Sequence, residues 1–280
     1  MKKPLLIILL LAINLFSFAQ TPAKTASRSL KKVLTLLMPR KAEDEMPGTR
    51  GACVAWHPVQ KKYYASMAGN YQYPMGVYYA TGKRLSAPDA SCQIDTRGLW
   101  YNTASGMIEG NTYAKAEPGG LFAYRLDAKG LLLQTMLYLN GTVIPADNAV
   151  GAYDATNHRI IYLVGNEVTS YDAADGKFIS STTIQWGHTK QQGPVDLSNE
   201  QLADDYNSTS VVYTGIKGAE WGLLNTNEKR LELYNEADGY LSRTWQFPTT
   251  AVLNSTFNLA YCNNILWSFD MDTRTWVGYQ

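Results

Sequence analysis

Residues 151–184 constrain the fold of this chain more than any other stretch, because they read as two β-hairpins in series. The run Arg159–Val164 is rich in β-branched and aromatic residues, which is typical of a strand. Turn-forming residues precede it at Asp154–Asn157, and an Asp175-Gly176 turn separates two further short strands. Four short antiparallel strands leave no room for a helix, so this stretch predicts a four-stranded sheet.

The same double hairpin recurs in weaker form before and after this stretch. Its first turns fall at His57, Asp95, Asp154, Thr214 and Asn254, and its second hairpins are marked by Tyr79, Tyr124, Tyr171, Tyr234 and Phe269. The spacing is near the ~40–50 residues of propeller repeats with four strands per blade. The pattern predicts an all-β protein, a single β-propeller of about five four-stranded blades over residues 51–280. The alternative fold is a pair of two-sheet sandwiches, but that fold would not require the same double hairpin to recur five times in the sequence.

The second hairpins also carry a resemblance to a known repeat family. In two of them Tyr171-Asp172 and Phe269-Asp270 lead through a turn into Lys177 and Trp276, which looks like the second half of kelch-type repeats. Ile160–Gly165 resembles the strand before it. The chain is thus similar to bacterial exported β-propellers with degenerate kelch-like repeats. Kelch-type propellers usually have six or seven blades, so the resemblance leaves a sixth blade open.

Composition agrees with a strand-rich domain and gives no sign of a nucleic-acid or membrane partner. Aromatic residues make up 12% of the chain and charged residues 18%, below the ~25% that is usual. The formal net charge is +1, so no global field favours nucleic acid or an anionic membrane.

Residues 1–19 have the pattern of a secretory signal peptide. Lys2-Lys3 precede an apolar run, Leu5–Phe16, and Ser17-Phe18-Ala19 fits a cleavage site before Gln20. The apolar run is too short to span a bilayer, which needs ~20 residues. We expect an exported protein, periplasmic or extracellular, without a membrane span in the mature chain. A membrane anchor or a core helix is the alternative.

Residues 20–50 differ from the repeats and are expected to form a linker or a docked N-terminal segment. Ser29 is placed to cap a short helix over Leu30–Met38, which Pro39 would end. A strand or helix that latches the propeller is the alternative; the composition favours the linker.

The three cysteines of the mature chain, Cys53, Cys92 and Cys262, allow at most one internal disulfide. Cys53 and Cys92 occupy nearly the same place in successive repeats, so they are the candidate pair. Alternatively, all three are buried small hydrophobic residues.

Motifs for catalysis and cofactors are not found in the sequence. His57, His158 and His188 lack the spacing of a metal site, and neither a phosphate-binding loop nor a Gly-x-Ser-x-Gly motif is present. We predict no cofactor, no metal and no catalytic residue. Loop carboxylates that distant blades could bring together stay open as an enzymatic pair: Glu109, Glu117, Asp147, Asp196, Asp204 and Asp205.

Two segments that the repeat does not explain are candidates for ligand binding. The insertion 185–210 carries Trp186, His188 and Tyr206, and the loop 70–74 carries Tyr71 and Tyr73. Aromatic side chains beside amides suit a sugar or a peptide, although Trp186 could instead pack in the core. The sequence therefore favours a module that binds an unknown protein, peptide or glycan. A glycan-active enzyme with carboxylates at the channel and a structural envelope component are the alternatives.

Overall fold

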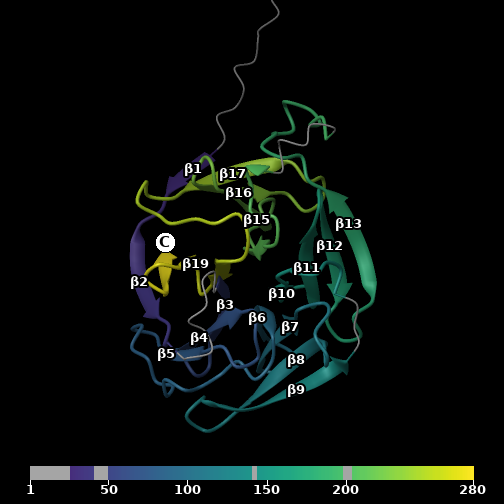
Figure 1. Cartoon of the computed structure of the whole chain (residues 1–280). Coiled ribbons are helices and arrows are strands. Elements are labelled where there is room, and N and C mark those ends of the chain that lie inside the picture. Colours follow the sequence, from purple (N-terminus) through teal and green to yellow (C-terminus); the bar gives the residue numbers. More distant parts are fainter. Residues whose placement is uncertain (1–25, 41–49, 141–143, 198–203) are drawn as a thin grey trace, which may run out of the picture.

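The computed structural model describes residues 26–40, 50–140, 144–197 and 204–280. Five β-sheets stand around a central axis, each with one strand at the axis and the others stepping outward (Figure 1). The predicted all-β propeller of about five blades is confirmed. Within the described ranges, no helix has the length and apolar character needed to cross a membrane.

The strands follow the blades in chain order. Blade 1 contains β3 (Arg50–His57), β4 (Lys62–Ala68) and β5 (Met75–Tyr79); blade 2 contains β6 (Thr96–Asn102), β7 (Met107–Thr112), β8 (Gly120–Leu126) and β9 (Leu132–Asn140). Blade 3 contains β10 (Ala152–Asp154), β11 (Arg159–Val164), β12 (Glu167–Asp172) and β13 (Phe178–Thr183). Blade 4 contains β14 (Val212–Tyr213), β15 (Trp221–Asn225), β16 (Arg230–Tyr234) and β17 (Leu241–Gln246). Blade 5 contains β18 (Leu259–Cys262), β19 (Ile265–Asp270) and β20 (Thr275–Tyr279).

The N-terminal segment completes the ring as two strands. β1 (Ala26–Ser29) pairs in parallel with β17 of blade 4, and β2 (Lys32–Leu37) pairs antiparallel with β20, which gives blade 5 its fourth strand. In Figure 1 the purple β2 lies at the rim beside the yellow C-terminal blade. The predicted helix over Leu30–Met38 is wrong. Leu36 and Met38 alternate with exposed residues and are buried on one face, so a strand buries them against the free edge of β20.

Backbone bonds tie this segment, which we call the N-terminal latch (residues 26–40), to three blades. Lys31 and Gln280 exchange two N–H···O bonds of 2.9 Å each, and Leu30 donates to Gln246 of blade 4. On blade 1, the Tyr78 hydroxyl donates to the Leu37 carbonyl at 2.8 Å. The latch is therefore part of the sheet structure at the seam where the last blade meets the first.

Side chains of blades 5 and 1 pack closely across that seam. Gly51 is the second residue of β3, and a Cβ there would lie 2.7 Å from the Phe269 ring and closer still to the Trp276 ring. Both rings are fully buried, with centroids 5.2 Å apart. The Gly51 N–H donates to Asn258 Oδ1 of blade 5 at 2.7 Å. Only glycine allows the backbone of blade 1 to approach these rings so closely.

The inner strand of blade 2 lies later in the sequence than predicted. The stretch 95–98 was expected to be a turn, but it leads into and begins β6, and the first turn of this blade follows Asn102. Gly98 is needed for packing, because a Cβ there would meet the Gly151 backbone of blade 3 at 2.6 Å. Arg97 points into the protein and pairs with Asp95, so its charge does not mark an exposed turn.

Candidate functional site

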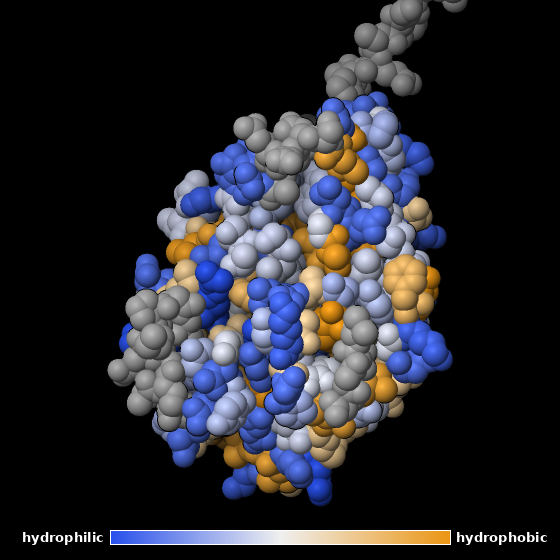
Figure 2. Space-filling view, turned by 45° about the vertical axis from the view of Figure 1, so that its right-hand side comes forward, coloured by the Kyte–Doolittle hydropathy of each residue, from blue (hydrophilic) through white to orange (hydrophobic). Residues whose placement is uncertain are grey.

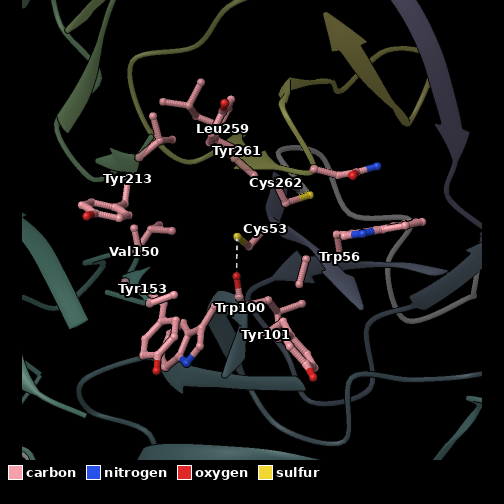
Figure 3. Close-up of a pocket in the computed structure, with 18 of the residues that line it drawn as sticks. Cys53, Trp56, Trp100, Tyr101, Val150, Tyr153, Tyr213, Leu259, Tyr261 and Cys262 are labelled. Carbon is pink, nitrogen blue, oxygen red and sulfur yellow. Dashed lines mark hydrogen bonds between the residues drawn. The ribbon is translucent and has the colours of Figure 1, made fainter. Parts of the chain in front are cut away.

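The five inner strands enclose a channel along the propeller axis, with a volume of about 240 Å³ (Figure 3). One end is open, because the lining residues Pro58, Ala155 and Asn263 are exposed there. The other end is closed: Ala52 and Ser210, which precede the lining residues Cys53 and Val211, are fully buried. The channel is thus a blind pocket whose mouth is formed by the first turn of each blade.

Each blade places one aromatic residue at this mouth, directly before its first turn. These residues, all partly exposed, are Trp56, Tyr101, Tyr153, Tyr213 and Tyr261. In Figure 3 the labelled rings of Trp56, Tyr101, Tyr153 and Tyr213 extend away from the channel. They reach the boundaries between blades, where Tyr101 packs on His57 at 4.7 Å and Tyr261 on Trp245 at 5.8 Å. These five aromatic side chains therefore pack between neighbouring blades. Backbone atoms and smaller side chains line most of the channel wall.

The channel offers little acid–base chemistry. Of the described residues that line it, none is Asp, Glu, His, Lys or Arg. The thiols of Cys53 and Cys262 face into it (Figure 3), and burial raises the pKa of Cys53 to about 11. Burial and the nearby Cys53 also raise the pKa of Cys262. Both side chains are neutral thiols near pH 7, which makes them poor nucleophiles.

The buried carboxylates of Glu109 and Glu232 are held by donors of the protein itself. Glu109 accepts bonds from Asn102 and Ser105, at 2.8 and 2.6 Å, and from Tyr138. Glu232 in blade 4 accepts bonds from Arg230, Tyr206 and Tyr234. These carboxylates accept hydrogen bonds that hold the blades in place, and neither residue lines the channel.

Asp154 lies close to the mouth, since it directly follows the lining residue Tyr153. Its side chain is fully buried and accepts bonds from Asn157 and, at 2.7 Å, from Arg159. Burial alone would raise the pKa of Asp154, but the bonds donated by Asn157, Arg159 and Tyr213 outweigh burial and lower it. Asp154 is thus an ionised carboxylate whose hydrogen bonds link blades 3 and 4, and it is not suited to donate a proton.

Replacement of Asp154 by asparagine is expected to lower the free energy of unfolding at pH 7 by about 1.5–3 kcal/mol, the range for hydrogen bonds to charged groups. The carboxylate contributes stability above its unfolded pKa of about 4, and this contribution is lost as the pH falls through the lower folded pKa. Urea unfolding at pH 7 and pH 3 should therefore show a smaller difference between the two proteins at pH 3. Asp272→Asn, at the exposed turn between β19 and β20, is the control that should change little. A difference that stays the same at both pH values would contradict an ionised Asp154.

A second site is a groove between blades 1 and 2, with a volume of about 570 Å³. Its walls are the β4–β5 loop, the segment before β6, the β7–β8 loop and β9, and we call it the outer groove. The described residues that carry its chemistry are Asn70, Tyr71, Gln93, Asp95, Glu117 and Thr135. The β4–β5 and β7–β8 loops lie at the strand ends opposite the first turns, so this groove opens on the face away from the channel mouth. In Figure 2, polar residues cover most of the molecular face shown, with apolar residues scattered among them.

The two predicted aromatic residues of loop 70–74 have different environments. Tyr71 lines the outer groove, and its side chain is 58% exposed. Tyr73 is partly buried and packs over Gly69, where a Cβ would meet its ring at 3.0 Å. Tyr71 is therefore exposed at the wall of the groove, whereas Tyr73 packs against the loop that carries both residues.

The predicted residues of insertion 185–210 do not gather at a surface. Trp186 and Tyr206 are 3% and 5% exposed and contact each other in the core between blades 3 and 4, with ring centroids 4.5 Å apart. Trp186 donates to Asn166 at 2.9 Å. His188 is partly buried and contacts the Gly193 carbonyl within its own loop. The insertion thus packs against the blades, and residues 198–203 within it lie outside the described ranges.

The predicted Cys53–Cys92 disulfide is not formed, since Cys53, Cys92 and Cys262 are all thiols in the structure. Cys53 lies on inner strand β3, whereas Cys92 lies in the connection before β6 and contacts the Pro74 carbonyl at 3.4 Å. The two residues were matched because the turn of blade 2 was placed too early in the sequence. Among the residues that the structure describes, no cluster of three or more His, Cys, Asp or Glu could hold a metal ion.

Comparison with known proteins places the chain by its fold. No family model matches it, and no curated protein matches its sequence. Among solved structures, glutaminyl cyclase of Myxococcus xanthus superposes with a TM-score of 0.53 at 11% identity, covering 92% of this chain and 98% of that one. A chain of a nidogen/laminin complex gives a TM-score of 0.40 at 9% identity, covering 69% and 62%. The chain is a five-bladed β-propeller, and at these identities the similarity shows the fold alone.

Proposed function

We propose that this protein is an exported binding module that holds a peptide or a glycan in the outer groove. The observation that carries the proposal is a groove of about 570 Å³ with a largely exposed tyrosine in its wall. This volume lies within the ~300–1,000 Å³ of typical ligand sites, while the channel lies below that range. Export rests on residues 1–19, and sequencing of the secreted form, expected to begin at Gln20, tests that part.

The enzymatic alternative finds less support in the channel. Glycosidic chemistry needs two carboxyl groups about 5–9 Å apart, and no carboxylate lines the channel among the described residues. Glutaminyl cyclisation is the activity named for the Myxococcus protein, and we do not extend it to this chain, because 11% identity supports the fold only.

Replacement of Tyr71 by alanine is expected to weaken or abolish ligand binding without loss of stability, because its exposed ring supplies contact area but no core packing. Binding is measured by screening the purified protein on peptide and glycan arrays and titrating each ligand found. Tyr79→Ala is the matched control: Tyr79 belongs to the same blade, is 42% exposed and lies outside the groove. Equal binding by the Tyr71 variant and the control would contradict the assignment of the groove.

A further inference from the structure

The outer groove has an uncompensated negative charge. Asp95 and Glu117 line it, and no lysine or arginine does among the described lining residues. Asp95 is already used by the protein, since it pairs with Arg97 and accepts the Gly69 N–H at 3.1 Å. Glu117 is exposed, and the described part of the chain forms no ion pair with it. Glu117 is therefore the carboxylate left for a ligand.

The surroundings of Glu117 suit a cation that is carried on an apolar stem. Tyr71 provides an exposed aromatic ring, and a cation over such a ring is attracted by its electron-rich face. Ile94 and Leu137 add apolar wall, against which the methylene stem of a lysine or arginine can pack while its charged end stays in water. The Thr135 hydroxyl donates to Gln93 Oε1 at 3.0 Å and Asn70 Oδ1 accepts the Gln72 N–H, so the side-chain NH₂ groups of Asn70 and Gln93 are the donors that this wall can offer to a peptide backbone.

We propose that the outer groove binds a peptide segment through one lysine or arginine side chain, with its charge between the Tyr71 ring and the Glu117 carboxylate. This inference rests on the proposed function and narrows its ligand to a basic peptide. A neutral glycan would use the ring and the amides but would leave the charge of Glu117 without a partner. Charge complementarity thus favours the peptide over the glycan.

The test uses the purified protein and three capped Gly/Ser pentapeptides that differ only at the central residue: Arg, Gln or Glu. Titration by NMR or calorimetry should rank them Arg, Gln, Glu, and the Arg peptide should weaken on going from 50 to 500 mM salt. Glu117→Gln should weaken the Arg peptide about two- to fivefold, as expected for an exposed ion pair. Tyr71→Ala should weaken it by a similar factor through loss of the ring.

Two control variants outside the groove test whether the effects on peptide binding are specific to Glu117 and Tyr71. Glu167→Gln removes an exposed carboxylate at the start of β12, away from the groove, and Tyr79→Ala removes an exposed ring; both should bind like the wild type. The proposal is overturned if the Arg and Gln peptides bind equally, if Glu117→Gln has no effect, or if the Arg peptide does not bind at millimolar concentration. If an array ligand such as a neutral glycan still depends on Tyr71, only the basic ligand is wrong and the binding function stands.

Discussion

Replacing Leu36 with alanine is expected to lower the free energy of unfolding by about 2–5 kcal/mol, the range for a fully buried leucine. Leu36 is 0% exposed on β2, where it packs into the largest core cluster together with residues of blades 1 and 5. The loss should appear in urea unfolding as a lower midpoint with an unchanged slope, because the amount of buried surface stays nearly the same.

The neighbouring residue supplies the control. Leu37 lies on the same strand but is 61% exposed, so Leu37→Ala should change stability by no more than about 0.5 kcal/mol. The Tyr78 hydroxyl bonds to the Leu37 backbone, which the substitution leaves in place. Two equal effects would mean that the N-terminal latch is not docked by its alternating face.

Trp276→Ala is expected to cost about 3–5 kcal/mol, because it removes a large side chain that is fully buried at the seam between blades 5 and 1. The indole N–H of Trp276 has no hydrogen-bond partner within the described residues, so the cost comes from packing alone. Trp276 lies on β20 between β19 and β2, and the cavity would open next to the latch. Thermal or urea unfolding measures the loss.

A double-mutant cycle with Gly51→Ala makes this prediction specific. In the wild type the added methyl group would strike the rings of Trp276 and Phe269, which is expected to cost about 1–3 kcal/mol. In the Trp276→Ala background one of these rings is gone, so the same methyl group should cost less, with a coupling of about 0.5–3 kcal/mol. Strict additivity would contradict the close contact across the seam.

The hairpins were predictable from the sequence where turns are exposed and strands are half-buried. Blade 3 follows the prediction because Asp-Gly and Asp/Asn turns flank runs of β-branched residues. In blade 2 the residue types were misleading. Glycine and arginine at positions 98 and 97 suggested an exposed turn, but Gly98 lies in close contact with blade 3 and the buried Arg97 pairs with Asp95. The latch was misread because the free edge of β20, which makes it a strand, is invisible in local sequence.

The site was predictable only in part, because exposure depends on tertiary contacts. Tyr71 was singled out as an aromatic residue in a polar loop, and it lines the outer groove. Trp186 and Tyr206 have the same residue character but meet in the core, a contact between distant parts of the insertion. Glu117 was named only as one of several loop acids, since its place in the same groove as Tyr71 arises from packing of blade 2 against blade 1. The aromatic residue before each first turn was visible in the sequence, but only if the repeats were aligned on Asn102.

The pairing of β2 with β20 also sets the order in which the ring can be completed. Lys32 pairs in register with Tyr279, so the contact that finishes blade 5 spans nearly the whole described chain. Such a non-local contact carries a large loop-closure entropy and is typical of slow-folding topologies. While the chain emerges from a ribosome, β2 cannot pair with β20 until β20 has followed it. Blade 5 is therefore completed only when β2 and β20, which lie near opposite ends of the described chain, come together.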